Sequence, residues 1–304
     1  MTTTLTDYSL YLFLHVFEEI YSPVQKIAFA PFNNLFVKRD DLIDPYISGN
    51  KWRKLKYILA RAKAENKTHL VTFGGAYSNH LVATAAAASR SGLTATAFVR
   101  GEEVKNEMLL LCNLFGMKLI FTDRESYRDK HKLFEQNFAN DAKAYFIDEG
   151  GASAEAIIGC AEVIGELTEP YDHIFCAAGT GTTAAGLLKG IQQQGLSTKL
   201  HIIPVLKGGS FIRDEIAKYT PLSSHLDLHL DYHFGGYAKT TPELINFIKT
   251  FTAQSGLLLD PVYTAKMFYA IQNLQQQGII GKDEKVLAIH TGGLMGLFGM
   301  KDKF

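Results

Sequence analysis

The sequence lacks an excess of charge of either sign. Among its 304 residues, 31 are Lys or Arg and 31 are Asp or Glu. A protein that binds along a nucleic acid needs surplus basic residues to neutralise the phosphates, so we expect no nucleic-acid partner. Hydrophobic residues make up 47% of the chain and charged residues 20%. These fractions are close to the globular average and exclude a largely disordered chain.

Cysteine and long apolar runs are also scarce. Cys112, Cys160 and Cys176 form no C-x-x-C pair and are odd in number, which is typical of reduced thiols packed in the core of a cytosolic protein. The apolar stretch at residues 8–17 is too short to span a bilayer and contains His15, and no positive charge precedes it. We therefore expect a cytoplasmic protein with no signal peptide and no membrane partner.

From residue 35 onward, short apolar segments alternate with longer helical patterns. This alternation is typical of βα units that build a parallel sheet. Residues 1–35 are expected to form an irregular arm with a short helix over 9–19. The predicted strands are at 35–37, 69–73, 94–99, 118–121, 144–147, 173–178, 201–206 and 285–289, and the predicted helices are at 52–62, 79–91, 105–115, 182–193, 241–255 and 262–277.

The predicted fold class is α/β, with two open, twisted, mainly parallel sheets. A chain of this length divides into two domains. We predict a larger domain built from residues 1–53 and 166–304 and a smaller one, residues 54–165, inserted into it. The larger domain is expected to bind a cofactor and the smaller one to close over a substrate.

Lys51 ends the segment S-G-N-K and is predicted to lie in the first turn of a helix. The helix macrodipole disfavours a cation there by a few tenths to ~1 kcal/mol. Arg53 and Lys54 add positive charge close by. Both effects favour the neutral amine, which is the form that attacks an aldehyde to give a Schiff base. Taken alone, a solvated surface lysine is the commoner explanation.

The segment F-G-G-A-Y-S-N-H at residues 73–80 follows a predicted strand and opens an Ala-rich helix. Its glycines allow a ligand close to the backbone, and Ser78 and Asn79 stand where the amides of the first helical turn can bind a carboxylate. The alternative is that Ser78 or Asn79 only caps the helix. His80 fits the pattern of a packed or solvent-facing helix residue.

The segment A-G-T-G-T-T-A-A-G at residues 178–186 also joins a buried strand to a helix. Free amides and hydroxyls at a helix start suit a phosphate group. The spacing also resembles a dinucleotide fingerprint, but that site needs an acid at the end of the next strand, and here K-G-G follows. The P-loop lysine is absent as well. Two explanations of this segment remain: a site for a monoester phosphate, or a purely structural turn.

Three further features complete the set. Asp260 and Pro261 mark the start of a helix that carries Tyr263, Thr291 follows the last predicted strand, and Tyr237 lies beside two glycines. Alone, each is explained by capping, a tight turn or packing. Together with an aldehyde-reactive lysine, a phosphate loop and a carboxylate site, they match what pyridoxal 5′-phosphate requires.

Five motifs, S-G-N-K-W-R-K-L, G-G-A-Y-S-N-H, G-T-G-T-T-A-A-G, L-L-L-D-P-V-Y-T-A-K and H-T-G-G, occur in that order. In this order the sequence resembles the D-cysteine desulfhydrase and 1-aminocyclopropane-1-carboxylate (ACC) deaminase family, over residues 33–298. These are fold type II pyridoxal phosphate enzymes of the tryptophan synthase beta superfamily. The resemblance implies pyridoxal phosphate, a small amino-acid substrate, a homodimer and no metal.

The resemblance also implies roles for individual residues. Lys51 would form the Schiff base and carry the proton at the substrate's α-carbon. The implied catalytic residues are Lys51, Ser78, Tyr237 and Tyr263; the cofactor-binding residues are Lys51, Asn79, Gly179, Thr180, Gly181, Thr182, Thr183 and Thr291; and the substrate-binding residues are Ser78, Asn79 and His80.

Thr264 and Thr291 bear on the reaction, because ACC deaminases have a glutamate after the active-site tyrosine. Threonine implies an uncharged partner for the pyridine nitrogen and a weaker electron sink, which suits elimination of a thiolate. The leading prediction is a D-cysteine desulfhydrase-like lyase that forms pyruvate, ammonia and sulfide. The alternatives are ACC deamination to 2-oxobutanoate and ammonia, and a non-catalytic protein that binds pyridoxal phosphate. A nucleotide-binding oxidoreductase is disfavoured by the missing acid.

Overall fold

The computed structural model describes residue 17, residues 20–29 and residues 32–304. They divide into two compact units. Unit 1 comprises Ile43–Ala156 with the described residues up to Tyr21, and unit 2 comprises Ser22–Leu42 and Ile157–Phe304. The predicted boundaries differ from these, since a border after residue 53 would have cut through a helix that lies wholly in unit 1.

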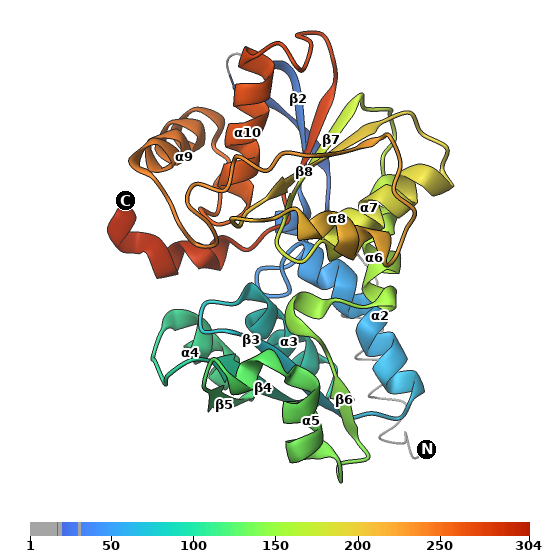
Figure 1. The fold of residues 1–304 in the computed structure, drawn as a ribbon, viewed down its shortest axis with the longest axis vertical. Helices are drawn as coiled ribbons and strands as arrows, with labels where there is room; N and C mark the ends of the chain where they lie inside the picture. The colour runs from blue at the N-terminus through green and yellow to red at the C-terminus, as the bar shows by residue number, and fades with distance from the viewer. Residues whose placement is uncertain (1–16, 18–19, 30–31) are drawn as a thin grey trace, which may run out of the picture. The chain divides into compact units, whose positions relative to one another are not determined.

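The order of elements follows the expected alternation of strands and helices (Figure 1). The strands are β1 (Val24–Phe29), β2 (Phe32–Lys38), β3 (His69–Gly75), β4 (Thr94–Arg100), β5 (Lys118–Thr122), β6 (Ala144–Phe146), β7 (His173–Ala178), β8 (Lys199–Pro204), β9 (Leu226–Leu228) and β10 (Val286–Ile289). The α-helices are α2 (Asn50–Ala64), α3 (Asn79–Arg90), α4 (Glu107–Leu114), α5 (Lys130–Phe138), α6 (Ala154–Gly165), α7 (Thr182–Gln193), α8 (Phe211–Ala217), α9 (Pro242–Ser255) and α10 (Thr264–Gln276). Short 3-10 helices cover Asp40–Leu42, Ser126–Arg128, Glu149–Gly151 and Leu294–Lys303.

Unit 1 is built on a parallel four-stranded sheet in the order β5-β4-β3-β6. Helix α3 packs on β3 and β4, and its alanines are almost fully buried, which lets it lie close to the sheet. An aromatic cluster lies under α5, where Phe73 and Phe98 pair in register and stack with their centroids 5.2 Å apart. Since α3 is the next element after β3, its start lies near the carboxyl end of that strand.

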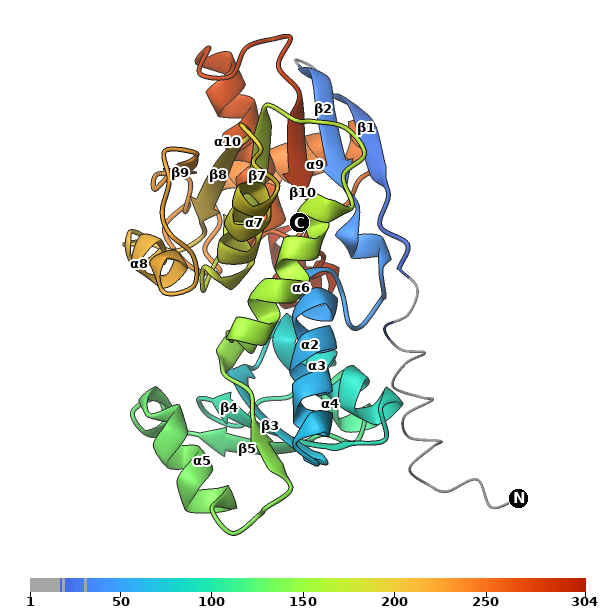
Figure 2. The same cartoon turned by 90° about the vertical axis from the view of Figure 1, so that its right-hand side faces the viewer.

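Unit 2 is built on a six-stranded sheet in the order β1-β2-β10-β7-β8-β9. All its neighbours are parallel except β1 and β2. Strand β7 is buried on both sides, with Phe175 in the core under α9 and α10 and Cys176 in the core under α6, α7 and α8 (Figure 2). Helices on both faces explain why its strands read as unbroken apolar runs.

The predicted fold class is confirmed, with its two mainly parallel sheets. The prediction that residues 1–35 are irregular is wrong over β1, which pairs with β2 as an antiparallel edge strand. The helix expected over 9–19 lies outside the described residues except for Phe17. All three cysteines are buried, as expected. Within the described part of the chain, no helix has both the length and the apolarity to cross a bilayer.

Candidate active site

Helix α2 begins without a side-chain cap. Its N-cap residue is Gly49, whose backbone angles of φ 56° and ψ −125° are open only to glycine at low cost. The first turn contains no acidic residue. Lys51 is the second residue of the helix, as predicted, and nothing acidic within that turn offsets the positive end of the macrodipole.

The Lys51 and Lys54 ammonium groups share one acceptor. Lys51 Nζ lies 3.3 Å and Lys54 Nζ 3.0 Å from the carbonyl oxygen of Gly150. Lys54 is buried, and its spacing of three from Lys51 puts both side chains on one face of α2. The place of Lys54 beside Lys51 was not predicted, although the i, i+3 spacing of the two lysines in S-G-N-K-W-R-K indicates it.

Helix α3 begins at Asn79, with Ser78 as its N-cap residue. The Ser78 side chain makes no capping hydrogen bond, although its backbone is extended as a cap requires. Capping by the side chain therefore does not account for Ser78, whose backbone carbonyl accepts from Leu81 N at 3.1 Å. Position 74 requires a glycine, since a Cβ there would approach Ser78 Oγ to 2.9 Å. This half of the site keeps the features of a carboxylate-binding helix start.

His80 is a packed residue of unit 1. Its Nε2 lies 2.7 Å from Thr72 Oγ1, and the Thr72 hydroxyl donates to Ile147 O at 2.9 Å. Because that hydroxyl proton is used, His80 must donate through Nε2, and its buried Nδ1 is an acceptor with no partner among the described residues. Burial lowers the pKa of His80 well below its usual value, and the positive charges of Lys51 and Lys54 add to the shift. His80 is therefore a neutral, buried residue of unit 1, and its role in substrate binding stays a prediction.

In unit 2, the segment 179–181 joins β7 to α7. Gly181 caps α7 in the left-handed conformation at φ 79° and offers no side chain of its own. The hydroxyls of Thr180 and Thr182 lie 3.2 Å apart beside the start of α7. Helix α7 is fixed by close packing on α6, where a Cβ on Gly186 would come within 2.3 Å of Cys160 Cβ.

Tyr263 and Tyr237 both lie close to this segment. A Cβ added to Gly179 would come 3.3 Å from both the ring and the hydroxyl of Tyr263, so the tyrosine lies against the loop. The Tyr263 hydroxyl is 3.4 Å from that of Tyr237, and the two rings are inclined at 75°. The structure thus brings together the loop at 179–183 and both predicted tyrosines.

Thr264 has a different role from the one expected. Its hydroxyl donates to Asp260 Oδ1 at 2.8 Å and accepts from Asp260 N at 2.9 Å. The Asp260 carboxylate also accepts from the backbone N–H groups of Val262, Tyr263 and Thr264. Burial raises the pKa of Asp260, and these hydrogen bonds oppose that shift. Thr264 therefore belongs to the cap of α10 and is not available to a pyridine nitrogen.

Thr291 remains available as an uncharged hydrogen-bonding residue. It follows β10 and is 8% exposed. Its side chain makes no hydrogen bond in the part of the chain that the structure describes, whereas the neighbouring His290 is held by Leu258 O at 2.8 Å. Of the two threonines singled out in the sequence, only Thr291 could bind a ligand through its hydroxyl.

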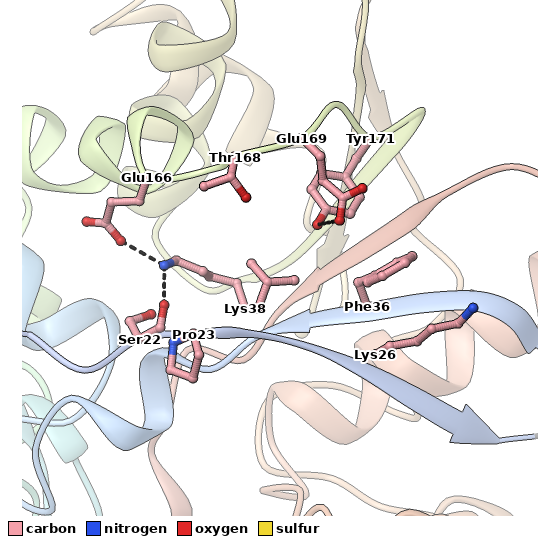
Figure 3. A pocket seen from close by; sticks show the side chains of 10 residues that line it. Ser22, Pro23, Lys26, Phe36, Lys38, Glu166, Thr168, Glu169 and Tyr171 are labelled. Atoms are coloured by element: carbon pink, nitrogen blue, oxygen red, sulfur yellow. Dashed lines mark hydrogen bonds and ion pairs between the residues drawn. The ribbon is translucent and has the colours of Figure 1, made fainter.

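A pocket of about 430 Å³ lies elsewhere in unit 2 (Figure 3). Its walls come from β1, β2 and the segment that follows α6, and they include none of the predicted site residues. Lys38 is buried there, with its ammonium between Ser22 O and Glu166 Oε2, the latter at 2.8 Å. This lysine is paired within the protein, and the pocket is not the candidate site.

The two sets of residues fit pyridoxal phosphate. The loop at 179–183 offers backbone N–H and threonine donors suited to a phosphate monoester. Lys51 offers a primary amine for the aldehyde, and Asn79 and Thr291 offer neutral hydrogen-bonding groups. Among the described residues, no group of three His, Cys, Asp or Glu side chains could hold a metal ion.

Comparisons with known proteins agree with this chemistry. A family model described as pyridoxal-phosphate dependent enzyme matches residues 20–292. A protein of Pyrococcus horikoshii with the provisional name 1-aminocyclopropane-1-carboxylate deaminase is 33% identical over 89% of this chain and 87% of its own length. A D-cysteine desulfhydrase of Salmonella choleraesuis is 30% identical over 87% of this chain and 88% of its own.

Solved structures give the same result at the level of the fold. The crystal structure of an ACC deaminase homologue superposes with a TM-score of 0.83 at 30% identity and covers 96% of this chain and 97% of that one. A hydrogen sulfide-producing enzyme of Fusobacterium nucleatum has a TM-score of 0.71 at 16% identity, over 92% of this chain and 97% of its own. At that identity the second likeness concerns the fold alone.

Proposed function

Because the chain belongs to the family of pyridoxal-phosphate-dependent enzymes, we propose that it is a lyase acting on a small amino acid, with D-cysteine as its leading substrate. D-cysteine and water would give pyruvate, ammonia and hydrogen sulfide. The relatives are named for both reactions, a deaminase at 33% identity and a desulfhydrase at 30%, so both reactions enter the proposal. A non-catalytic role is disfavoured, because the relatives are enzymes and Lys51, Ser78, Asn79 and Tyr263 are all present.

The residues of unit 1 would bind the substrate and move its α-proton. Lys51 would hold the cofactor through its amine and then carry the proton at the α-carbon. Lys54, on the same face of α2, adds positive charge that favours a neutral Lys51 amine. Ser78 and the amides at the start of α3 would hold the substrate carboxylate, and Asn79 would contact the cofactor ring.

The residues of unit 2 would hold the phosphate and supply a second acid or base. The amides and hydroxyls of the loop at 179–183 would bind the phosphate, and Thr291 would be a neutral partner for the ring. The cofactor, when bound, supplies the electron sink for the carbanion at the α-carbon. Tyr263 and Tyr237 would donate or accept a proton at the side-chain end of the substrate.

The hydrogen bonding of Thr264 is the observation that favours elimination of a thiolate over opening of the ACC ring. The position that holds a glutamate in ACC deaminases here holds a hydroxyl committed to Asp260 on both its donor and its acceptor side. A charged partner for the pyridine nitrogen is therefore missing from this position. A weaker electron sink favours loss of a thiolate, a good leaving group, over opening of a cyclopropane ring.

ACC deamination to 2-oxobutanoate and ammonia is the second candidate. It is favoured by the tyrosine pair, whose hydroxyls lie 3.4 Å apart and could assist ring opening by proton transfer. It is also favoured by the similarity to the ACC deaminase homologue of known structure. For either reaction we propose a homodimer, which light scattering on the purified enzyme can test.

The test is a product assay of the purified holoenzyme with D-cysteine, L-cysteine, D-serine and ACC. Pyruvate and sulfide from D-cysteine at a higher kcat/KM than from the other three would support the leading proposal. The Lys51→Ala variant, purified in the same way, controls for contaminating lyases. If 2-oxobutanoate forms from ACC and no pyruvate forms from any β-substituted alanine, the second candidate replaces the first.

A further inference from the structure

A second lysine, Lys266, is buried in unit 2 without a role in the chemistry described above. It lies on α10, three residues after Tyr263, and is fully buried. Its ammonium donates to three backbone carbonyls, those of Val205 at 3.0 Å and of His233 and Gly236 at 2.8 Å each. An ammonium has three donors, so all of them are satisfied. Lys266 thus ties α10 both to the end of β8 and to the segment before Tyr237.

The segment tied by Lys266 has a strained backbone. Phe234 and Ala238 adopt the left-handed conformation at φ 51° and φ 53°, and Gly235 and Gly236 between them also have positive φ. A residue with a side chain adopts this conformation only at a cost in free energy. Such a conformation persists only where the surroundings enforce it. The two carbonyls that Lys266 binds in this segment stand directly before Phe234 and directly before Tyr237.

We propose that Lys266 is a positioning residue that holds residues 233–238 in the conformation that places the Tyr237 hydroxyl beside that of Tyr263. Tyr263 begins the same helix as Lys266, so a single side chain relates the backbones that carry the two tyrosines. The inference rests on the proposed function of this pair as acid and base. An apolar side chain of similar length would fill the same volume without desolvating a charge, so packing alone does not account for a lysine here.

The first measurement does not depend on activity. Amide hydrogen exchange of residues 234–239 is compared between the full-length wild-type holoenzyme and Lys266→Met. We expect exchange at least about 10-fold faster in the variant, because the carbonyls lose their shared donor and the strained turn opens locally. Lys38→Met is the matched control, since Lys38 is also a buried lysine of unit 2 but is bonded to Ser22 and Glu166. It should leave exchange at 234–239 unchanged.

The second measurement is a double-mutant cycle on kcat with Tyr237→Phe. If Lys266 acts through Tyr237, Lys266→Met should lower kcat about 10-fold in the wild type and less than about 2-fold in the Tyr237→Phe background. A merely structural loss would give the same factor in both backgrounds. KM and the visible absorbance of the bound cofactor should stay within about 2-fold of the wild type.

Unchanged exchange at 234–239, or equal factors in both arms of the cycle, would overturn the inference. Where Lys266→Met does not yield folded protein by circular dichroism, Lys266→Gln retains two donors and replaces it in both measurements, with a smaller expected change in the same direction. Failure of the proposed function is recognised separately, because a wild type inactive on all four substrates leaves the exchange measurement intact. In that case hydrogen exchange alone decides.

Discussion

Helices α2 and α10 each begin beside a residue with a proposed catalytic role, but their first turns are capped in opposite ways. At the start of α2 the N-cap residue is Gly49, which has no side chain to accept a hydrogen bond, and the first turn, which includes Lys51, holds no acidic residue. At the start of α10 the buried Asp260 carboxylate accepts from three backbone N–H groups and from the Thr264 hydroxyl. One helix start keeps its positive potential, and the other has it neutralised.

The two lysines near these helix starts differ in the same way. Lys51 is half-buried and shares the Gly150 carbonyl with Lys54, at 3.3 Å. Lys266 is fully buried and has three carbonyls within 3.0 Å. Lys51 shares its 3.3 Å acceptor with a second ammonium group, which suits an amine that must react, whereas all three donors of Lys266 are satisfied, which suits an amine that positions a segment.

Replacing Lys51 tests the reactive side of this comparison and should have the largest effect. Lys51→Ala removes the only amine proposed to bind the cofactor covalently and to carry the α-proton. We expect kcat to fall by at least about 10³-fold and the visible absorbance band of the bound cofactor to disappear on purification. Steady-state kinetics and an absorbance scan measure both effects.

Lys56→Ala is the control on the same helix. Its ammonium lies 5.7 Å from the Trp52 ring and 5.1 Å from the Tyr57 ring, and it has no proposed part in the reaction. It should keep the absorbance band and most of the activity. A Lys51→Ala variant with a normal band would show that another amine holds the cofactor, and the reactive role of the α2 start would be lost.

Removing the cap of α10 tests the structural side. Asp260→Ala leaves three backbone N–H groups, two of them in buried hydrogen bonds, and the Thr264 hydroxyl without the carboxylate that accepts from them. We expect the free energy of unfolding to fall by about 3–4 kcal/mol in urea denaturation. Because Tyr263 starts this helix, kcat should fall with stability, while the absorbance band of the cofactor on Lys51 should persist.

Thr241→Ala measures what an ordinary cap contributes in the same unit. The Thr241 hydroxyl accepts only from Leu244 N, at 3.3 Å, at the start of α9. We expect a loss of about 1 kcal/mol. If Asp260→Ala costs no more than Thr241→Ala, the Asp260 network is not what stabilises the α10 start.

The charge of Lys266 should appear in the pH dependence of stability. Burial lowers the pKa of Lys266 to about 8, and Asp260 opposes the shift. In the unfolded chain the amine titrates near 10.4. As the pH rises from about 8 to about 10.4, the unfolded chain loses a proton that the folded protein has already released, so the free energy of unfolding should rise by up to about 2–3 kcal/mol.

Other groups titrate in that range, so the informative quantity is the difference between wild type and Lys266→Met across it. Urea denaturation at closely spaced pH values between 7.5 and 11, a range set by those two pKa values, supplies both curves. Parallel curves would mean that Lys266 keeps its proton, and the comparison with Lys51 would rest on contact geometry alone.

The sequence predicted what depends on local pattern. Alternating apolar segments located every described strand except β1 and β9, and the position of Lys51 after a glycine located the start of α2. Helices α5, α6 and α8 were also not predicted. In β1, Gln25 and Lys26 are exposed on an antiparallel edge, so the strand lacks an apolar run. The burial of His80 and the commitment of Thr264 to Asp260 depend on contacts between side chains. Residue type and spacing leave such contacts open, so a ligand-binding threonine and a capping threonine look alike in sequence.

Substitution of the two glycine caps should have the smallest effect on stability. It allows a comparison of the starts of α2 and α7, both of which are proposed to face ligands. Gly49 at φ 56° and ψ −125° is outside the left-handed helical region, whereas Gly181 at φ 79° and ψ −15° lies near it. We expect Gly49→Ala to lower the free energy of unfolding by about 2 kcal/mol and Gly181→Ala by about 1 kcal/mol, measured by urea denaturation. A Cβ on Gly181 would also meet Glu215 Cβ at 3.3 Å, a contact that a small shift can relieve. If Gly181→Ala proves the more costly, that contact outweighs backbone strain, and the start of α7 is the more rigid of the two.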